Sequence, residues 1–181
     1  MLFEERRFAL KDGREAVLRA AEPDDAPQML DYLTTTARET EFVLRYPEEC
    51  RWTEEQERRL LENFRDNPDS LFLTCFVDSE LTGNCELQFN QKIKVRHRAS
   101  VAIALCKKYW GLGIGTAMFR AMEDVARQRG VRQLELEYID GNARGKALYE
   151  KMGFVRIAEH PEAIRLRDGS FRSLVFMMKK L

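Results

Sequence analysis

Residues 109–118, YWGLGIGTAM, place three glycines within five positions, directly before a stretch that has the pattern of a helix. The start of a helix exposes backbone N–H groups that lack a partner within the helix, and it carries the positive end of the helix dipole. An anion bound there gains hydrogen bonds and a favourable charge interaction. Glycine has no Cβ and adopts positive φ angles, so successive N–H groups can approach one ligand. Gly111, Gly113 and Gly115 therefore predict a cradle for a phosphate group.

Two well-known phosphate motifs fit this glycine turn poorly. A P-loop requires Gly-Lys-Ser/Thr, which the sequence does not contain. The dinucleotide fingerprint GxGxxG fits Gly111 and Gly113, but its third glycine position holds Thr116, although Glu135 follows at the spacing of about 20 residues that this fingerprint expects. CKKYW separates the preceding strand from the first glycine, and the motif lies too late in the chain for a second nucleotide-binding half. A nicotinamide-dependent enzyme is therefore kept only as an alternative.

The sequence after the turn predicts an alternation of helices and strands. An apolar stripe with helical spacing predicts a helix over 114–129, ending at Gly130. VRQLELEY (131–138) alternates as a strand does, and NARGKALYEKM (142–152) predicts a short helix closed by Gly153. Two further strands follow, separated by an Asp-Gly turn.

The first half of the chain predicts four strands and two helices. These elements are a strand near 14–20, a helix from about Asp24, a second helix from a Thr53–Gln56 capping box to about Asn67, and strands over 71–77, 81–89 and 91–105. Several strands thus follow one another before a strand–helix–strand unit. This order predicts an α/β (α+β) fold, a mixed sheet with helices on its faces.

The longest alternation lies in QKIKVRHRASVAIAL (91–105). Four basic residues from Lys92 to Arg98 share one face, and His97 lies in the apolar row of the other face. A histidine in an apolar row is more often a packed, hydrogen-bonded core residue than a catalyst. We therefore expect a buried His97 without a catalytic role.

Composition and charge exclude several classes of protein. The 181 residues suit a single domain, 1–181, with a sizeable core. The 30 basic residues balance the 30 acidic ones, which argues against nucleic acid or a membrane surface as a partner. No apolar run has the length of about 18 residues that a membrane span needs, and MLFEERRF lacks the apolar core of a signal peptide. Four cysteines without CxxC spacing and two histidines argue against a metal site, so we expect no metal and a cytoplasmic location.

Beyond the turn itself, YWGLGIGTAM, a helix, LELEY and NARGKALYEKMGF follow one another in an order and spacing that resemble the GNAT acetyltransferase superfamily. The resemblance implies a mixed, mainly antiparallel, twisted sheet with helices on both faces, and acetyl-CoA as the cosubstrate. In that family a turn of pattern Gln/Arg-x-x-Gly-x-Gly/Ala binds the cosubstrate's pyrophosphate, and here Gly113 and Gly115 stand at the glycine positions while Trp110 replaces Gln/Arg. The residues of the turn implied to bind the cosubstrate are Trp110, Gly111, Leu112, Gly113, Ile114, Gly115 and Thr116.

The resemblance also implies contacts with the rest of the cosubstrate. The backbone of the strand that ends at Leu105, around Ile103, would pair with the pantetheine amides and offer an N–H to the thioester carbonyl. In this family that strand often carries a bulge and splays from its neighbour, which opens a cleft. Asn142 would contact the pantetheine arm, and Tyr149, seven residues later on the same helical face, would present its hydroxyl to the thioester sulfur. We therefore expect Tyr149 to act as the general acid.

The general base is less well determined. Many relatives place a glutamate in a stretch like RHRAELGI, but here the stretch is RHRASVAI, and Ser100 stands at that position. A serine cannot serve as a base at neutral pH without a partner. Glu86 on the neighbouring strand, Glu137 in LELEY and a relayed water are the candidates that remain. Among them we predict Glu86, and His97 is less favoured.

The acceptor side of the site gives conflicting signals. The stretch ETEFVLRYPEEC (39–50), which would border the acceptor in this fold, carries four glutamates that could attract a cationic amine, namely Glu39, Glu41, Glu48 and Glu49. The aromatic residues that could pack against such an amine are Phe42, Tyr46 and Trp52. An ordinary charged loop is the simpler interpretation, and the basic row from Lys92 to Arg98 would instead suit an acidic acceptor. The sequence therefore names no acceptor.

The residues and the resemblance together predict an acetyl-CoA-dependent N-acetyltransferase that transfers acetyl directly to a primary amine of a small molecule or a protein. No cysteine is placed to form an acyl-enzyme, although Cys106 abuts the cosubstrate strand. A non-catalytic acyl-CoA-binding sensor or interaction module is the alternative, because Ser100 replaces the strand glutamate. We expect neither nucleic acid nor a membrane as a partner, and a homodimer is compatible with the sequence.

Overall fold

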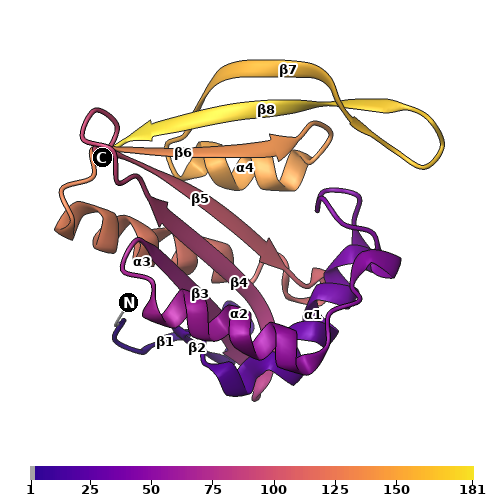
Figure 1. Ribbon diagram of the computed structural model, residues 1–181, viewed down its shortest axis with the longest axis vertical. Coiled ribbons are helices and arrows are strands. Elements are labelled where there is room, and N and C mark those ends of the chain that lie inside the picture. The colour runs from indigo at the N-terminus through magenta and orange to yellow at the C-terminus, as the bar shows by residue number, and fades with distance from the viewer. Residues whose placement is uncertain (1–2) are drawn as a thin grey trace.

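A twisted sheet organises residues 3–181, which are the residues that the computed structural model describes (Figure 1). Within them, eight strands are hydrogen-bonded in the order β1-β2-β3-β4-β5-β6-β8-β7. The strands are β1 (Arg6–Ala9), β2 (Glu15–Ala20), β3 (Ser70–Val77), β4 (Glu80–Phe89), β5 (Arg98–Leu105), β6 (Gln133–Ile139), β7 (Val155–Arg165) and β8 (Phe171–Lys180). The helices are α1 (Ala26–Glu39), α2 (Glu54–Asp66), α3 (Ile114–Gln128) and α4 (Ala143–Lys151). β5 and β6 run parallel and the other neighbours antiparallel, so the predicted mixed, mainly antiparallel sheet is confirmed.

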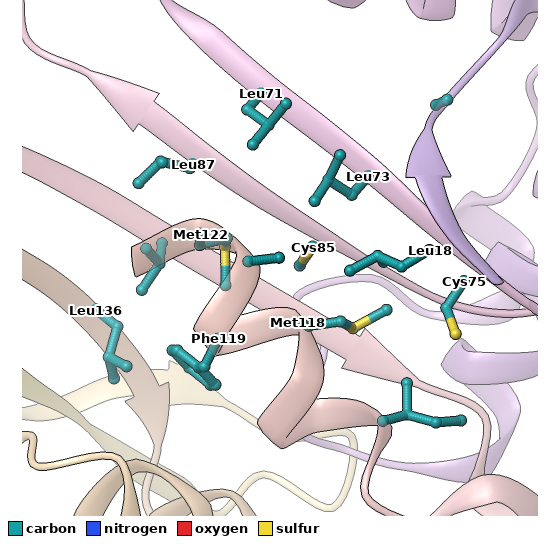
Figure 2. Packing of buried hydrophobic residues seen from close by; sticks show 14 of the residues in the cluster. Leu18, Leu71, Leu73, Cys75, Cys85, Leu87, Met118, Phe119, Met122 and Leu136 are labelled. Carbon is teal, nitrogen blue, oxygen red and sulfur yellow. The ribbon is translucent and has the colours of Figure 1, made fainter. Parts of the chain in front are cut away.

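A hydrophobic core joins α3 to one face of the sheet (Figure 2). The apolar stripe of the sequence places Met118, Phe119 and Met122 on the buried face of α3. They belong to one cluster with buried side chains from six of the described strands, among them Leu18, Leu71, Leu73, Cys85, Leu87 and Leu136. Because α3 follows β5 by only eight residues, this packing also fixes the glycine turn against the end of β5.

The opposite face of the sheet is covered by α1 and α2 (Figure 1). The predicted capping box begins α2: Gln56 N donates to Thr53 Oγ1 at 3.2 Å, and Thr53 N donates to Gln56 Oε1 at 2.8 Å. Phe64 of α2 stacks on Phe72 of β3, with ring centroids 4.6 Å apart. Helices therefore lie on both faces, as predicted, and none of those in residues 3–181 combines the length and the apolar character that crossing a bilayer requires.

The two parallel strands separate after a short paired stretch. Arg98–Ser100 of β5 lie beside Gln133–Glu135 of β6, and from there the strands diverge (Figure 1). The splay that the family resemblance implies is therefore present. The bulge is not, because β4 and β5 keep one register without a shift along their paired length. The divergence leaves the last residues of β5 without a neighbouring strand on the side away from β4.

The predicted strand over 91–105 is wrong in its first half. β5 begins at Arg98, and residues 91–97 form a turn that is closed by backbone hydrogen bonds onto the carbonyl oxygen of Lys92. β4 ends at Phe89 and pairs antiparallel with β5, so the chain must reverse direction between them. Alternating residues cannot reveal such a reversal, because a turn can carry the same pattern of charged and apolar residues.

The same turn changes the prediction for His97. Its side chain is exposed and does not lie in an apolar row, which corrects the expectation of a buried core residue. The residue acts through its backbone, since its carbonyl oxygen accepts from Arg132 N at 2.8 Å and from Gln133 N at 3.1 Å. Lys92 and Lys94 are likewise exposed on the turn and form no basic face of a strand.

Candidate active site

The glycine turn supplies a row of backbone donors at the start of α3. Gly111 and Gly113 have φ angles of +83° and +106°, and Gly113 is the N-cap residue of the helix. Within residues 3–181, none of the N–H groups from 111 to 116 donates a hydrogen bond to a protein acceptor. The carbonyl oxygen of Leu112 accepts from Lys11 N at 3.1 Å, which ties the turn to the hairpin between β1 and β2. A helix start with free donors is the arrangement that favours a bound anion.

The glycines of the turn serve different purposes. A Cβ on Gly113 would meet no protein atom within 4 Å, so the space in front of this residue is open. A Cβ on Gly115 would lie 2.7 Å from Leu148 Cδ2, so α3 packs closely on α4 here and a larger residue would displace the end of the Leu148 side chain. The sequence predicts both as phosphate-binding residues, and the packing role of Gly115 is an addition that only the structure provides.

A cavity of about 250 Å³, here called the first cavity, opens onto this turn. Its walls come from the end of β5, the glycine turn, α4 and the last turn of α1. Of the residues predicted to bind the cosubstrate, it brings together Ile103, Leu105, Trp110, Gly111, Gly113, Ile114, Gly115, Thr116, Asn142 and Tyr149. Two predicted site residues, Leu112 and Glu86, are not on its wall.

Three cationic side chains on this wall were missed by the sequence prediction. Lys11 comes from the turn between β1 and β2, and Arg144 and Lys151 come from α4. The Arg144 guanidinium lies over the Trp110 ring, 5.3 Å from its centroid, and Lys151 Nζ lies 3.3 Å from Thr116 Oγ1. Among the described residues none of the three forms an ion pair, so their charge is available to an anion. The seven-residue spacing of Arg144 and Lys151, which matches that of Asn142 and Tyr149, was a signal for two of them.

The free edge of β5 lines the same cavity with backbone groups. Cys106 N donates to Thr82 O at 2.9 Å, so alternate residues of β5, counted back from Cys106, are bonded to β4. The residues between them, Ile103 and Leu105, therefore direct their N–H and C=O groups away from β4. The Leu105 carbonyl oxygen accepts from the indole Nε1 of Trp110 at 2.8 Å, which anchors the turn to the strand. The N–H groups of both residues and the Ile103 carbonyl face the opening.

Tyr32 of α1 contacts β5 from the face of the sheet that α1 and α2 cover (Figure 1). Its buried hydroxyl lies 2.7 Å from Asn84 Oδ1 and 2.8 Å from the carbonyl oxygen of Ala104. Burial raises the pKa of Tyr32, so the hydroxyl stays protonated and can act as a donor. The contact joins α1, β4 and β5, and it holds the last turn of α1 over the cavity.

Tyr149 presents an isolated hydroxyl on the wall of the first cavity. Its ring is buried, in edge contact with Phe119 (centroids 5.8 Å apart) and near Tyr138 (5.6 Å). Its hydroxyl forms no hydrogen bond with any of residues 3–181. Burial raises the pKa of Tyr149 to about 12, and the neighbouring Tyr138 adds to the increase. The hydroxyl therefore stays protonated at neutral pH and can donate to a ligand.

Asn142 begins α4 on the same wall. Its Oδ1 accepts from Gly145 N at 2.8 Å, so the side chain caps the helix and is held in one orientation. A Cβ on residue 145 would lie 2.6 Å from Asn142 Nδ2, which explains the glycine at this position. With Oδ1 used by the cap, the amide nitrogen is the group that Asn142 can offer to a ligand.

The predicted base, Glu86, lies on β4 beside Ala102 of β5, outside the walls of the first cavity. It is half-buried, and its carboxylate forms no hydrogen bond or ion pair with any described residue. Burial raises the pKa of this carboxyl group. Glu137, the other candidate, is exposed on β6 and also lies outside the cavity. The identity of the base therefore stays a prediction.

A second cavity, of about 770 Å³, adjoins the first. It lies between the connection of α1 to α2 (residues 40–48) and the end of β7 with the turn that follows (residues 164–167). Four residues belong to both walls, namely Thr40, Phe42, Val43 and Trp110. The two cavities are therefore neighbours, and Trp110 stands at their boundary.

The glutamates of the α1–α2 connection are mostly engaged within the protein. Glu48 pairs with the guanidinium of Arg167, which also lies over a tyrosine ring, and Glu49 Oε2 accepts from Tyr46 N at 2.7 Å. Glu39 Oε2 accepts from Lys107 N at 2.6 Å. Three of the four carboxylates that could attract a cationic amine are therefore engaged within the protein. Trp52, predicted to pack the acceptor, is half exposed and lies outside both cavities.

The cysteines offer no nucleophile to either cavity. All four are free thiols, and Cys106 is buried beside β5 without reaching a cavity wall. Burial raises the pKa of Cys106 to about 11, so it is a thiol rather than a thiolate at neutral pH. Among residues 3–181 there is also no group of three or more metal-ligating side chains that could hold a metal ion.

Comparison with known proteins adds a family to this geometry. The model of the family described as "Acetyltransferase (GNAT) family" matches residues 28–154, which include β5, the glycine turn and α4. A solved GNAT-family acetyltransferase from Streptococcus pneumoniae superposes with a TM-score of 0.84 at 25% identity, covering 92% of this chain and 99% of that one.

Two curated relatives match shorter segments. A mycothiol acetyltransferase from Beutenbergia cavernae is 47% identical over 53 residues, which are 29% of this chain and 18% of the relative. N-alpha-acetyltransferase 30 from Schizosaccharomyces pombe is 37% identical over 54 residues, 30% of this chain and 36% of the relative. The matched segments thus span well under half the length of either relative.

Proposed function

The chain belongs to the acetyltransferase (GNAT) family, and from this premise we propose that it transfers the acetyl group of acetyl-CoA to a primary amine by direct attack in a ternary complex. The observation that carries the proposal is the row of free N–H groups from 111 to 116, placed on the same cavity as the isolated hydroxyl of Tyr149. The first cavity then holds the cosubstrate, and the second cavity holds the acceptor.

The turn at the start of α3 fits a diphosphate. Free N–H groups supply hydrogen bonds, and the open space in front of Gly113 leaves room for an anion to approach them. The cationic side chains of Lys11, Arg144 and Lys151 balance the negative charge of the phosphates. In this arrangement the backbone N–H groups bind the diphosphate, and the Trp110 indole holds the turn against Leu105. Trp110 can therefore replace the family's Gln/Arg.

The free edge of β5 fits the amides of the pantetheine arm. Ile103 and Leu105 offer backbone donors and one acceptor in the alternation that an added strand would need. An N–H of this edge, near Leu105, also meets the need for a donor to the oxygen of the thioester carbonyl, where negative charge develops during attack. Asn142, on the opposite wall, offers its amide nitrogen to the same arm.

The chemical step requires a neutral amine and a stabilised thiolate. The amine nitrogen attacks the thioester carbon, the C–N bond forms, the C–S bond breaks, and coenzyme A leaves as a thiolate that takes up a proton. We assign Tyr149 as the donor to the sulfur. Because its pKa of about 12 exceeds that of a thiol, about 8.5, its hydrogen bond to the thiolate is the main contribution, more than complete transfer of its own proton.

We assign removal of the amine proton to Glu86, acting through a relayed water because the carboxylate lies outside both cavities. Its raised pKa makes it a stronger base than an exposed glutamate, and its oxygens are not engaged by any described residue. Ser100, at the position where relatives carry glutamate, lies across from Gln88 of β4, two residues from Glu86 on the same face.

Titration with acetyl-CoA in a calorimeter, followed by a free-thiol assay with a panel of amines, tests the proposal. We expect binding of acetyl-CoA and amine-dependent release of coenzyme A. Binding without release of thiol for any amine would favour the alternative, an acyl-CoA-binding sensor, which Ser100 at the position of the family glutamate supports. Binding of NAD without any response to acetyl-CoA would contradict the assignment of the first cavity.

A further inference from the structure

The walls of the second cavity carry an excess of positive charge. The cationic residues are Arg38, Arg45, Lys107, Arg165 and Arg167, and the acidic ones are Glu39, Glu41 and Glu48. Arg167 and Glu48 pair with each other, and the carboxylate of Glu39 is occupied by a backbone N–H. Among residues 3–181 the other four cations form no ion pair, and although the carboxylate of Glu41 is also unengaged, cations outnumber carboxylates on this wall.

Arg45 is the cation with the most restricted surroundings. It is half-buried, and its Nε is fully buried without a hydrogen-bond partner. Glu57 of α2 is buried, and the positive charge of Arg45 lowers its pKa, although burial raises that pKa more; the two side chains form no ion pair. The terminal Nη atoms are not fully buried and form no hydrogen bond with a described residue, so they are the donors that Arg45 can offer to a ligand in the cavity. Arginine matches a carboxylate in shape as well as in charge, because its fork can bind both oxygens.

The remainder of the wall is mostly apolar. Its apolar and aromatic side chains include Phe42, Val43, Leu44, Tyr46, Ile164 and Leu166. A ligand that suits both features has a carboxylate for the cations and an apolar side chain for this surface. Its amine must lie near Trp110, where the second cavity meets the first.

We propose that the acceptor is a small amino acid-like molecule with an apolar side chain, whose carboxylate is bound by Arg45. This inference rests on the proposed function, since it concerns the acceptor of the same reaction. It differs from the possibility that the loop attracts a cation, because three of its four glutamates are engaged within the protein, whereas the Arg45 side chain forms no hydrogen bond or ion pair with a described residue.

Paired acceptors test this inference. Leucine, methionine, phenylalanine and tryptophan are each compared with the corresponding amino acid amide, which keeps the amine and the side chain but lacks the carboxylate. For at least one pair we expect kcat/KM to be at least tenfold higher for the amino acid. Ionisation of the amine works against this result, because the amine of an amide loses its proton more readily, so a preference for the acid must come from binding.

Variants of Arg45 test whether this residue causes the preference for the amino acid over its amide. Arg45→Gln should raise KM for the amino acid at least tenfold, leave kcat/KM for the amide unchanged and so remove the preference, and Arg45→Lys should restore part of it. Arg51→Gln is the matched control, because Arg51 lies in the same connection but outside the cavity wall, and its kinetics should equal those of the wild type. Unchanged binding of acetyl-CoA shows that each variant is folded.

The remaining outcomes separate the two levels of the proposal. Equal or faster acetylation of the amides, or an equal loss for both members of a pair in Arg45→Gln, would overturn the carboxylate site while leaving the acetyltransferase intact. Acetylation of peptide N-termini but of none of the amino acids would overturn it in favour of a protein acceptor. Absence of acetyl-CoA binding in the wild type would refute the proposed function itself.

Discussion

The two cavities of this protein are built from different parts of the chain. The first is framed by β5, α3 and α4, and its hydrogen-bond donors are largely backbone groups of the glycine turn and of the β5 edge. The second lies between two connections, and its charges are carried by side chains that are far apart in sequence, as in the pair of Glu48 and Arg167.

This difference bears on what each cavity can tolerate. A backbone site keeps its donors when side chains change, so Trp110 can stand where the family has Gln/Arg. A site built from side chains can change its ligand preference with a single substitution, because each charged side chain supplies a large part of the site's total charge. We therefore expect the first cavity to define the reaction and the second to define the acceptor.

The largest effect should come from the side chain on which the chemistry of the first cavity depends. Tyr149→Phe removes a donor that has no partner in the protein, so stability and the Kd for acetyl-CoA should stay unchanged, whereas kcat should fall about 100-fold. Calorimetry and a thiol-release assay measure the two quantities. Tyr138→Phe is the control, since its ring adjoins Tyr149 outside the cavity wall and its activity should be that of the wild type. A loss of less than threefold in Tyr149→Phe would remove Tyr149 from the mechanism.

The next largest effect tests the backbone cradle itself. Gly113→Val fills the open space in front of the amides and forces a β-branched residue to a φ of +106°, so we expect acetyl-CoA binding to weaken about 30-fold, or about 2 kcal/mol. Gly130→Val is the matched control, because this glycine also has positive φ and open space but lies at the other end of α3. It should lower the melting temperature and leave the Kd unchanged. Equal Kd values for both variants would contradict the cradle.

The same contrast explains what could be predicted from the sequence. Sequence patterns predicted the helices and most of the strands, because burial on one face imposes a period on the residues, but β1 (Arg6–Ala9) was not predicted. The glycine turn predicted the row of backbone donors at the start of α3, because such a row depends on residues that are adjacent in sequence. The error in 91–97 has a related cause, since alternation does not show where β4 ends and the chain reverses.

The missed residues come from distant segments. Lys11 lies in the first hairpin, about 100 residues before the glycine turn that it contacts. Tyr32 lies in α1, about 70 residues before its contact on β5. The engagement of Glu48 by Arg167 spans 119 positions. No local pattern encodes such contacts, because they depend on how β7 and the α1–α2 connection meet in the folded protein.

A smaller effect should come from Glu86, which acts from outside both cavities. Glu86→Gln removes the proposed proton acceptor, and because a relayed water still contacts the amine we expect kcat/KM to fall about tenfold. In the wild type, activity should fall as the pH is lowered through the raised pKa of Glu86, in addition to the effect of amine ionisation. The glutamine variant should show amine ionisation alone, and pH profiles of both proteins measure the difference.

The pH dependence of protein stability gives an independent test of the raised pKa of Glu86. Because burial raises the pKa of Glu86, the folded protein binds its proton more tightly than the unfolded chain does. Its contribution to stability is therefore lost as the pH rises from the unfolded pKa through the folded pKa, and Glu86→Gln should not show that loss. A stabilised variant with an unchanged pH profile would make Glu86 a buried group without a catalytic role.

The smallest effect should come from a side chain that assists the backbone cradle. Lys11 is exposed on the hairpin turn, so replacing it with glutamine should weaken acetyl-CoA binding only about threefold and reduce the dependence of the Kd on salt. Lys92→Gln, an exposed lysine on the turn before β5, should change neither. The backbone N–H of residue 11 still holds Leu112 in the variant, so a loss approaching that of Gly113→Val would mean that side-chain charge, and not the row of amides, dominates the first cavity. The two cavities would then differ in where they lie in the fold, but both would depend mainly on side-chain charge.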